Sequence, residues 1–115
     1  MDTPIYKIVP RPLWREAEAK GRFEGAPVDL KDGYIHFSTG AQVRETAERH
    51  FSGEDDLLLL AIDADALGDA LKWERSRGGQ LFPHLYGPLP LDRVLWAEDL
   101  PLAPDGHHTF PASVR

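Results

Sequence analysis

His36 stands in a short segment, 32–39, that holds several groups able to bind a small ligand. Residues 34–37 form a β-prone run, and Ser38 and Thr39 follow directly, where either hydroxyl could cap a helix. A strand that ends at a helix start would place an imidazole, two hydroxyls and free helix N–H groups around one point. That arrangement suits a phosphate, a carboxamide or a ribose hydroxyl. A structural reading is also open, in which His36 bonds to the backbone inside the core and the hydroxyls serve only as caps.

A second group of polar side chains consists of Glu74, Arg75 and Arg77, followed by the glycines at 78–79. A carboxylate at the end of a predicted strand would here meet two guanidinium groups on a glycine-rich loop. Arginine is the residue best suited to bidentate contact with a phosphate, so the group predicts a phosphate contact. The alternative is a surface ion pair on a mobile loop.

The third group lies in the run 80–86, where Phe82, His84 and Tyr86 occupy alternate positions. In a strand this alternation places the three rings on one face. Two aromatic rings beside an imidazole could enclose a flat heterocycle, with His84 available for proton transfer. Ordinary packing of aromatic side chains on a sheet is the competing interpretation.

Hydrophobic periodicity and the positions of Gly and Pro predict the elements that carry these groups. Strands are expected at 5–9, 57–62, 71–74, 80–86 and 94–97, and helices at 12–20 and 40–52. The apolar run at 57–62 is typical of a central strand, whereas Pro83 predicts an edge strand or a broken one. Residues 21–33 show no period and predict a loop or a weak strand. The chain is therefore predicted to be α+β, with one curved, mainly antiparallel sheet and two short helices.

The expected domain organisation is a single globular domain over residues 1–100 and a loosely ordered tail over residues 101–115. The tail has three prolines and no hydrophobic period. His107 and His108 lie in this tail without organised neighbours, so we do not expect them to take part in a site.

The composition of the 115-residue chain excludes several classes of function. Thirteen basic against nineteen acidic residues give a net charge of -6, which disfavours nucleic acids and anionic membranes as partners but leaves small anionic ligands open. The absence of Cys excludes disulfides, thiolate zinc sites and a cysteine nucleophile. With no leader pattern and no long apolar run, a cytoplasmic protein is expected.

The order of motifs resembles that of a known family. The sequences IYKI, DGYIHFST, LLLLAID and KWERSRGGQLFPHLYGPLP, with a Trp in the first helix, follow one another between residues 5 and 100. In this order they resemble the bacterial domain-of-unknown-function 952 family. The resemblance implies an ADP-ribosyltransferase-like fold and, with it, NAD as a possible substrate.

Cleavage of the nicotinamide bond of NAD passes through an oxocarbenium-like state, which needs an anchor for the ribose or carboxamide, an aromatic clamp and a carboxylate. The resemblance implies His36 as anchor, Phe82 with Tyr86 as clamp, Arg75 or Arg77 as diphosphate contact, and Glu74 or Glu98 as carboxylate.

The predicted site therefore has two sets of residues, and no covalently bound cofactor or resident metal is predicted with them. The candidate catalytic residues are His36, Glu74 and His84, and the candidate ligand contacts are Ser38, Thr39, Arg75, Arg77, Phe82 and Tyr86. The leading hypothesis is an enzyme, or an enzyme-derived domain, that binds NAD or an ADP-ribose-like nucleotide. The alternatives are a non-catalytic module that binds a small ligand or a protein, and a His-based metal hydrolase.

Overall fold

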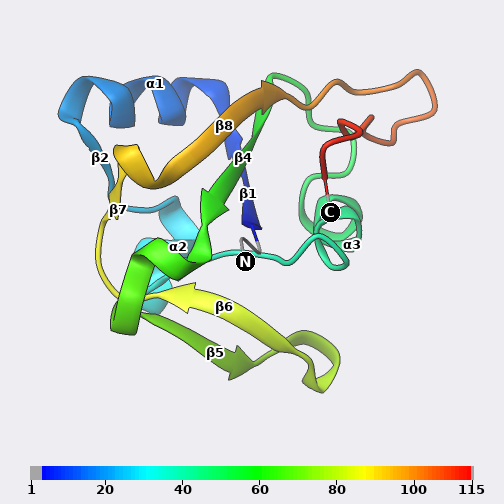
Figure 1. The fold of residues 1–115 in the computed structure, drawn as a ribbon. Helices are drawn as coiled ribbons and strands as arrows, with labels where there is room; N and C mark the ends of the chain where they lie inside the picture. Colours follow the sequence, from blue (N-terminus) through cyan, green and yellow to red (C-terminus); the bar gives the residue numbers. More distant parts are fainter. Residues whose placement is uncertain (1–3, 115) are drawn as a thin grey trace.

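The computed structural model describes residues 4–114, and Figure 1 shows how their elements are arranged. The α-helices in this part of the chain are α1 (Arg11–Lys20), α2 (Pro27–Asp32) and α3 (Val43–His50). The strands are β1 (Pro4–Pro10), β2 (Arg22–Phe23), β3 (Ile35–His36), β4 (Leu57–Asp63), β5 (Leu71–Arg75), β6 (Leu81–Leu85), β7 (Leu89–Pro90) and β8 (Val94–Asp99). Short 3-10 helices are η1 (Ala64–Ala70), η2 (Arg77–Gly79) and η3 (Leu91–Arg93).

The strands within the described residues form three antiparallel sheets, with the orders β1-β4-β8, β2-β7 and β3-β6-β5. The α+β class and the antiparallel pairing are confirmed, but the single curved sheet that we expected is wrong. The first and third sheets meet at one pair of residues, where Tyr6 and Ser38 exchange backbone hydrogen bonds of 2.7 and 2.9 Å. Because β3 is only two residues long, pairing does not extend beyond this contact, and the strands remain in separate sheets.

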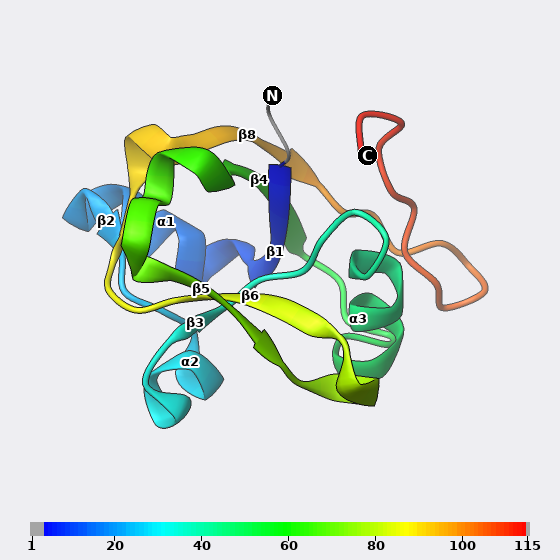
Figure 2. The same ribbon diagram turned by 60° about the horizontal axis from the view of Figure 1, so that its bottom comes forward.

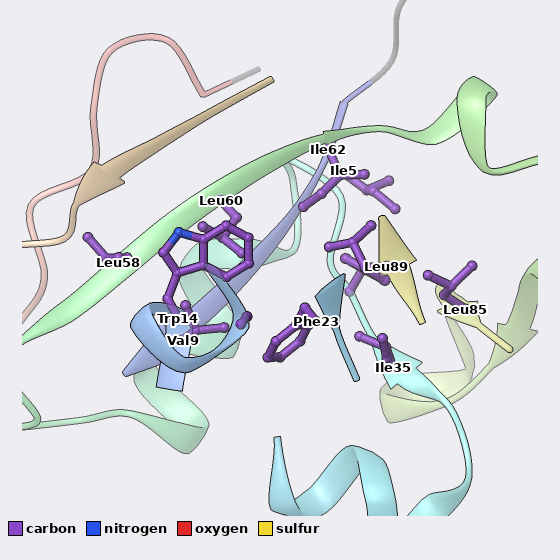
Figure 3. Packing of buried hydrophobic residues seen from close by; sticks show 12 residues of the cluster. Ile5, Val9, Trp14, Phe23, Ile35, Leu58, Leu60, Ile62, Leu85 and Leu89 are labelled. Atoms are coloured by element: carbon purple, nitrogen blue, oxygen red, sulfur yellow. The ribbon is translucent and has the colours of Figure 1, made fainter. Parts of the chain in front are cut away.

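Strand β4 is the central strand of the first sheet, as its apolar run predicts. Its side chains alternate between the two faces, and each face has its own hydrophobic cluster. Leu58, Leu60 and Ile62 pack with Trp14 of α1 and with Phe23 of β2, as Figure 3 shows. On the opposite face the cluster is completed by α3 and consists of Tyr6, Ile8, Val43, Ala47, Leu57, Leu59, Ala61 and Leu100.

Helix α2 occupies a segment for which we expected a loop or a weak strand. It begins at Pro27, whose missing N–H costs nothing in the first turn, and it is capped after Asp32 by Gly33, which has φ +88°. Six residues are too few to show a helical period, so the sequence predicted two helices where the described residues hold three.

Strand β6 lies between β3 and β5, so the expectation that Pro83 marks an edge strand is wrong. Pro83 accepts a 3.0 Å hydrogen bond from the N–H of Phe37 but cannot return one. Because β3 ends at His36, the backbone N–H that Pro83 lacks would lie just beyond the last pair of the β3–β6 ladder. The sheet therefore loses only one hydrogen bond at Pro83.

The C-terminal segment, which we expected to be loosely ordered, makes specific contacts over residues 101–114. The N–H of Thr109 donates to the carbonyl of Pro101 at 2.8 Å, and His108 Nε2 lies 2.7 Å from the carbonyl oxygen of Glu54. Phe110 packs against the cluster beneath α3, and the Arg44 guanidinium lies 5.0 Å from its ring centre. Figure 2 shows this segment beside α3, away from β5 and β6.

We therefore expect Phe110→Ala to lower the free energy of unfolding by about 1–3 kcal/mol, because the substitution removes a partly buried aromatic side chain from the cluster. Thermal or urea unfolding measures this loss. Ser113→Ala serves as the control in the same segment, and an unchanged stability of the Phe110 variant would show that the contact of Phe110 with the cluster adds nothing to the fold.

Candidate functional site

The register of the third sheet brings His36 and His84 together. His36 of β3 pairs directly with His84 of β6, and their ring centres lie 5.4 Å apart. If the three sequence motifs form one site, the strand ends at 34–38, 71–75 and 82–86 must lie side by side. The order β3-β6-β5 confirms that adjacency, which can be followed in Figure 2.

His36 is held between two carboxylates of helix α2. Its Nδ1 lies 2.6 Å from Asp29 Oδ1, and its Nε2 lies 3.0 Å from Asp32 Oδ2. Asp29 is 2% exposed, and Gly25 packs over it so closely that a Cβ there would lie 2.9 Å from the Asp29 Cβ. The side chain of His36 remains 30% exposed, so one edge of the ring reaches the surface.

Lys7 is buried behind this histidine. Its Nζ lies 3.1 Å from Asp29 Oδ2 and donates a 2.8 Å hydrogen bond to the carbonyl of His36. Asp29 also accepts hydrogen bonds from the backbone N–H groups of Ala26 and His36. Burial opposes the charge of Asp29, but the hydrogen bond with His36, the charge of Lys7 and the two N–H groups outweigh it and lower the pKa of Asp29 to about 2. Burial lowers the pKa of Lys7 against the opposing effect of Asp29.

The depressed pKa of Asp29 predicts a loss of stability in acid. Its folded pKa of about 2 lies below the ordinary 3.8, so the stabilisation is complete above pH 4 and decreases as the pH falls toward 2. The shift corresponds to about 2 kcal/mol at 1.36 kcal/mol for each pKa unit. Urea unfolding of the wild type and of Asp29→Asn over this pH range measures it. Parallel pH profiles of the two proteins would contradict the assignment.

His84 forms the second pair of a histidine with a carboxylate. Its Nδ1 lies 2.8 Å from Glu74 Oε1, and the hydroxyl of Tyr86 donates to the same oxygen at 2.9 Å. These hydrogen bonds lower the pKa of Glu74, and the contact with Glu74 raises the pKa of Tyr86. The side chain of His84 is only 4% exposed, because Tyr34 stacks on it with 4.2 Å between ring centres.

Tyr34 joins the rings of the site. It also lies 4.7 Å from His36 and 5.2 Å from Tyr86, both between ring centres. Burial, together with the negative charges of Asp32 and Glu74, raises the pKa of the Tyr34 hydroxyl. The hydroxyl therefore keeps its proton near neutral pH and can donate a hydrogen bond.

Both histidines line a groove of about 910 Å³. Its polar lining includes basic groups on η2 and α3, namely Arg77, Arg49 and His50. Arg77 stacks over Phe82, with 4.8 Å to the ring centre, and lies 3.3 Å from the hydroxyl of Thr46. Burial and the nearby positive charges of Arg77, Arg49 and His36 lower the pKa of His50. In a chain with a net charge of -6, this groove is a local concentration of basic groups.

The structure brings some of the sequence-predicted site residues to the groove and leaves others outside it. The predicted residues that line the groove are His36, Ser38, Arg77, Phe82 and His84. Glu74 and Tyr86 do not line it but contact His84 from behind. Arg75 is exposed and donates to the carbonyl of Gly79, and the N–H of Thr39 is bonded to Gln42.

Glu98, the competing candidate for the carboxylate, is separated from the site. It lies on β8 of the first sheet, opposite Leu59, and does not line the groove. The side chain of Arg75 extends from β5 on the face opposite that of Glu74, because successive strand residues alternate. Sequence reasoning grouped these residues by their distance along the chain and could not tell on which face they lie.

Sequence reasoning missed four residues of the site: Lys7, Asp29, Asp32 and Tyr34. The sequence held one signal for Asp29, because an acidic residue two positions after a proline such as Pro27 is typical of the start of a helix. Asp29 does occupy this position and bonds to the N–H of Ala26. Lys7 carried no such signal, because a lysine in a strand is normally exposed.

The described residues contain no group of three or more His, Asp or Glu side chains arranged to hold a metal ion. They also contain no helix long and apolar enough to cross a membrane.

Comparison with known proteins gives the family. Residues 8–97 match the family described as "Protein of unknown function (DUF952)". The chain is similar to CC0527 from Caulobacter crescentus, with 53% sequence identity to the protein in its crystal structure. The match covers 93% of this chain and 94% of that chain, with a TM-score of 0.90. The solution NMR structure of CC0527 is 54% identical over 90% of each chain, with a TM-score of 0.82. No curated protein matches the chain. On the extent of this match, and on the arrangement shared with CC0527, the chain belongs to the DUF952 family.

Proposed function

We propose that the groove binds NAD or an ADP-ribose-like nucleotide, and that the chain is an ADP-ribosyltransferase-like enzyme or a derivative of one. The observation that carries the proposal is the meeting of His36 and His84, each paired with its own carboxylate, in a groove that also holds basic groups. Such pairing orients an imidazole and supports proton transfer or a hydrogen bond to a ligand.

The size and lining of the groove fit a nucleotide. Sites for small molecules and cofactors usually measure about 300–1,000 Å³ and combine apolar walls with a few polar groups. The groove falls within this range at about 910 Å³. Arg77 and Arg49 offer guanidinium groups to a diphosphate, and Phe82 offers an apolar surface beside them.

A transferase of this type needs a carboxylate near the ribose, and the candidate that faces the groove is Asp32. It lines the groove next to His36 Nε2, whereas Glu74 is engaged by His84 and Tyr86 outside it. A carboxylate at this place would stabilise positive charge that develops on a ribosyl group.

The second candidate function is a module that binds the nucleotide without cleaving it. The engagement of Glu74 favours this candidate, because it removes a predicted catalytic carboxylate from the groove. The two candidates predict the same ligand but differ in the fate of the nicotinamide bond.

Calorimetry with NAD, ADP-ribose and nicotinamide at up to millimolar concentrations tests the binding. Prolonged incubation with NAD, followed by chromatographic detection of free nicotinamide, tests the cleavage. Binding with release of nicotinamide that is lost in His36→Ala supports the enzyme, and binding without release supports the module. No heat with any of the three compounds would refute both.

Substitution of Arg77 tests where the diphosphate lies. Arg77→Gln is expected to weaken NAD and ADP-ribose about 10- to 100-fold, the effect of losing one hydrogen bond to a charged group. Nicotinamide has no phosphate, so its affinity should stay unchanged. The matched control is Arg75→Gln, which removes an equal charge outside the groove and should leave all three affinities as they are. Equal losses for both variants would mean that only the overall charge matters.

A further inference from the structure

Hydrogen bonds join Lys7, Asp29 and His36 beside the groove, which Lys7 and His36 both line. Asp29 is buried and does not line the groove. It contacts the Nδ1 of His36 at 2.6 Å, and His36 lines the groove. This histidine and Lys7, which also lines the groove, are the two partners through which Asp29 acts on a ligand.

The hydrogen bonds around Asp29 determine where the proton of His36 lies. The carboxylate accepts from two backbone N–H groups and from the ammonium of Lys7, and each of these groups can only donate. An ionised carboxylate has only acceptors, so the short contact with His36 Nδ1 needs a proton on that nitrogen. A neutral imidazole has one N–H, and Nε2 is then left with a lone pair.

Lys7 adds a second restraint to the same histidine. Its ammonium holds the carbonyl oxygen of His36 at 2.8 Å while it pairs with the carboxylate that holds the ring. Lys7 comes from β1 and Asp29 from α2, so two different elements fix the backbone and the ring of one residue of β3.

We propose that Asp29 and Lys7 are positioning residues that keep the proton of neutral His36 on Nδ1 and present Nε2 to a ligand hydroxyl in the groove. Asp32 Oδ2 lies 3.0 Å from this Nε2, and the two carboxylate contacts together need a proton on each ring nitrogen. When His36 is neutral, the buried Asp29 keeps the one remaining proton on Nδ1, and Nε2 then accepts from another donor. The hydroxyl of a ribose is such a donor, and Asp32 remains beside it in the lining of the groove. This ligand rests on the proposed function, but the position of the proton on His36 does not.

The proton position can be measured in the unmodified protein without a ligand. Long-range proton–nitrogen NMR correlation spectra distinguish the two neutral tautomers of each histidine. At alkaline pH we expect His36 to show a single Nδ1–H tautomer. A neutral His36 with its proton on Nε2 would overturn the proposal.

Two variants separate positioning from a general effect on the site. Asp29→Asn retains the size of the side chain but can present an N–H to Nδ1, so we expect a mixture of His36 tautomers and weaker binding of NAD. Glu74→Gln makes the same change at His84 and serves as the control, with the His36 tautomer unaltered. A single Nδ1–H tautomer in Asp29→Asn, or an equal disturbance of His36 in Glu74→Gln, would overturn the role of Asp29.

The role of Lys7 is tested by Lys7→Met, which keeps the length of the side chain without its charge. We expect a folded protein in which the NMR signals of His36 broaden or shift, and unchanged His36 signals would overturn this part of the proposal.

The position of the proton and the proposed function can fail separately. If wild-type His36 is the Nδ1–H tautomer but NAD does not bind, the proposed function fails while the positioning role stands. The two failures are therefore distinguishable.

Discussion

Asp29→Ala is expected to lower the free energy of unfolding by about 3–5 kcal/mol at neutral pH, the cost of removing one partner from a buried ion pair. The substitution leaves the ammonium of Lys7, which is 8% exposed, without its counter-ion. It also removes the acceptor from the N–H groups of Ala26 and His36. Guanidinium or urea unfolding measures the loss.

The size of this loss should decrease as the pH rises, because burial already lowers the pKa of Lys7. Once Lys7 releases its proton, the variant buries no unpaired charge, while the wild type has lost its ion pair.

The double variant Lys7→Met/Asp29→Ala tests the coupling between the two residues. Because they contact each other, its loss of stability should be smaller than the sum of the losses in the single variants. Simple additivity would contradict an energetic coupling between these residues.

The matched control is Glu18→Ala, which removes an acidic partner from the exposed ion pair with Arg15 on helix α1. Exposed pairs of this kind contribute about 0–1 kcal/mol, so the control should have nearly wild-type stability. A loss in Asp29→Ala as small as in the control would mean that the buried pair adds little to folding.

His36→Ala is expected to weaken the binding of NAD about 10- to 100-fold, as for one lost hydrogen bond to a charged or strongly polar partner. The cost in stability should be smaller than for Asp29→Ala, because Asp29 keeps Lys7 and two backbone donors. Calorimetry and thermal unfolding of one preparation measure both effects. A large fall in the melting temperature with unchanged affinity would assign His36 a purely structural role.

His84→Ala is expected to differ from His36→Ala in its effect on stability. His84 is buried beneath Tyr34, so its removal leaves a cavity under the aromatic ring. We expect this variant to lose both affinity and stability. The comparison of the two histidine variants thus separates the effect of the partly exposed ring of His36 from that of the buried ring of His84.

The groove is the place where we expect this acidic chain to bind a small anion. The net charge of the chain, -6, argues against long polyanions as ligands, because their binding depends on many contacts over a surface. Within the groove, however, the guanidinium groups of Arg77 and Arg49 lie together and are only partly balanced by Glu45. A small anionic ligand experiences these near charges more strongly than distant ones, because salt screens interactions beyond about 8–10 Å.

Several properties of the protein were determined by the sequence alone. The α+β class, the central position of β4 and helix α1 between Pro12 and Gly21 follow from patterns within about ten residues. Such patterns are local, because side chains repeat with the period of the element that carries them. His36 and His84 were singled out by the same local evidence, namely polar rings within β-prone runs.

Only the tertiary structure decided which of these residues meet. The two-residue strand β3 is too short for any sequence pattern, yet its pairing with β6 brings His36 to His84. Helix α2 is likewise too short, and it supplies both carboxylates of His36. Lys7 lies 22 residues from Asp29 along the chain, and an ion pair over that distance leaves no trace in local spacing. Pairing between distant segments depends on how the whole core packs, so the sequence could predict the chemical groups of the site but not the contacts that orient them.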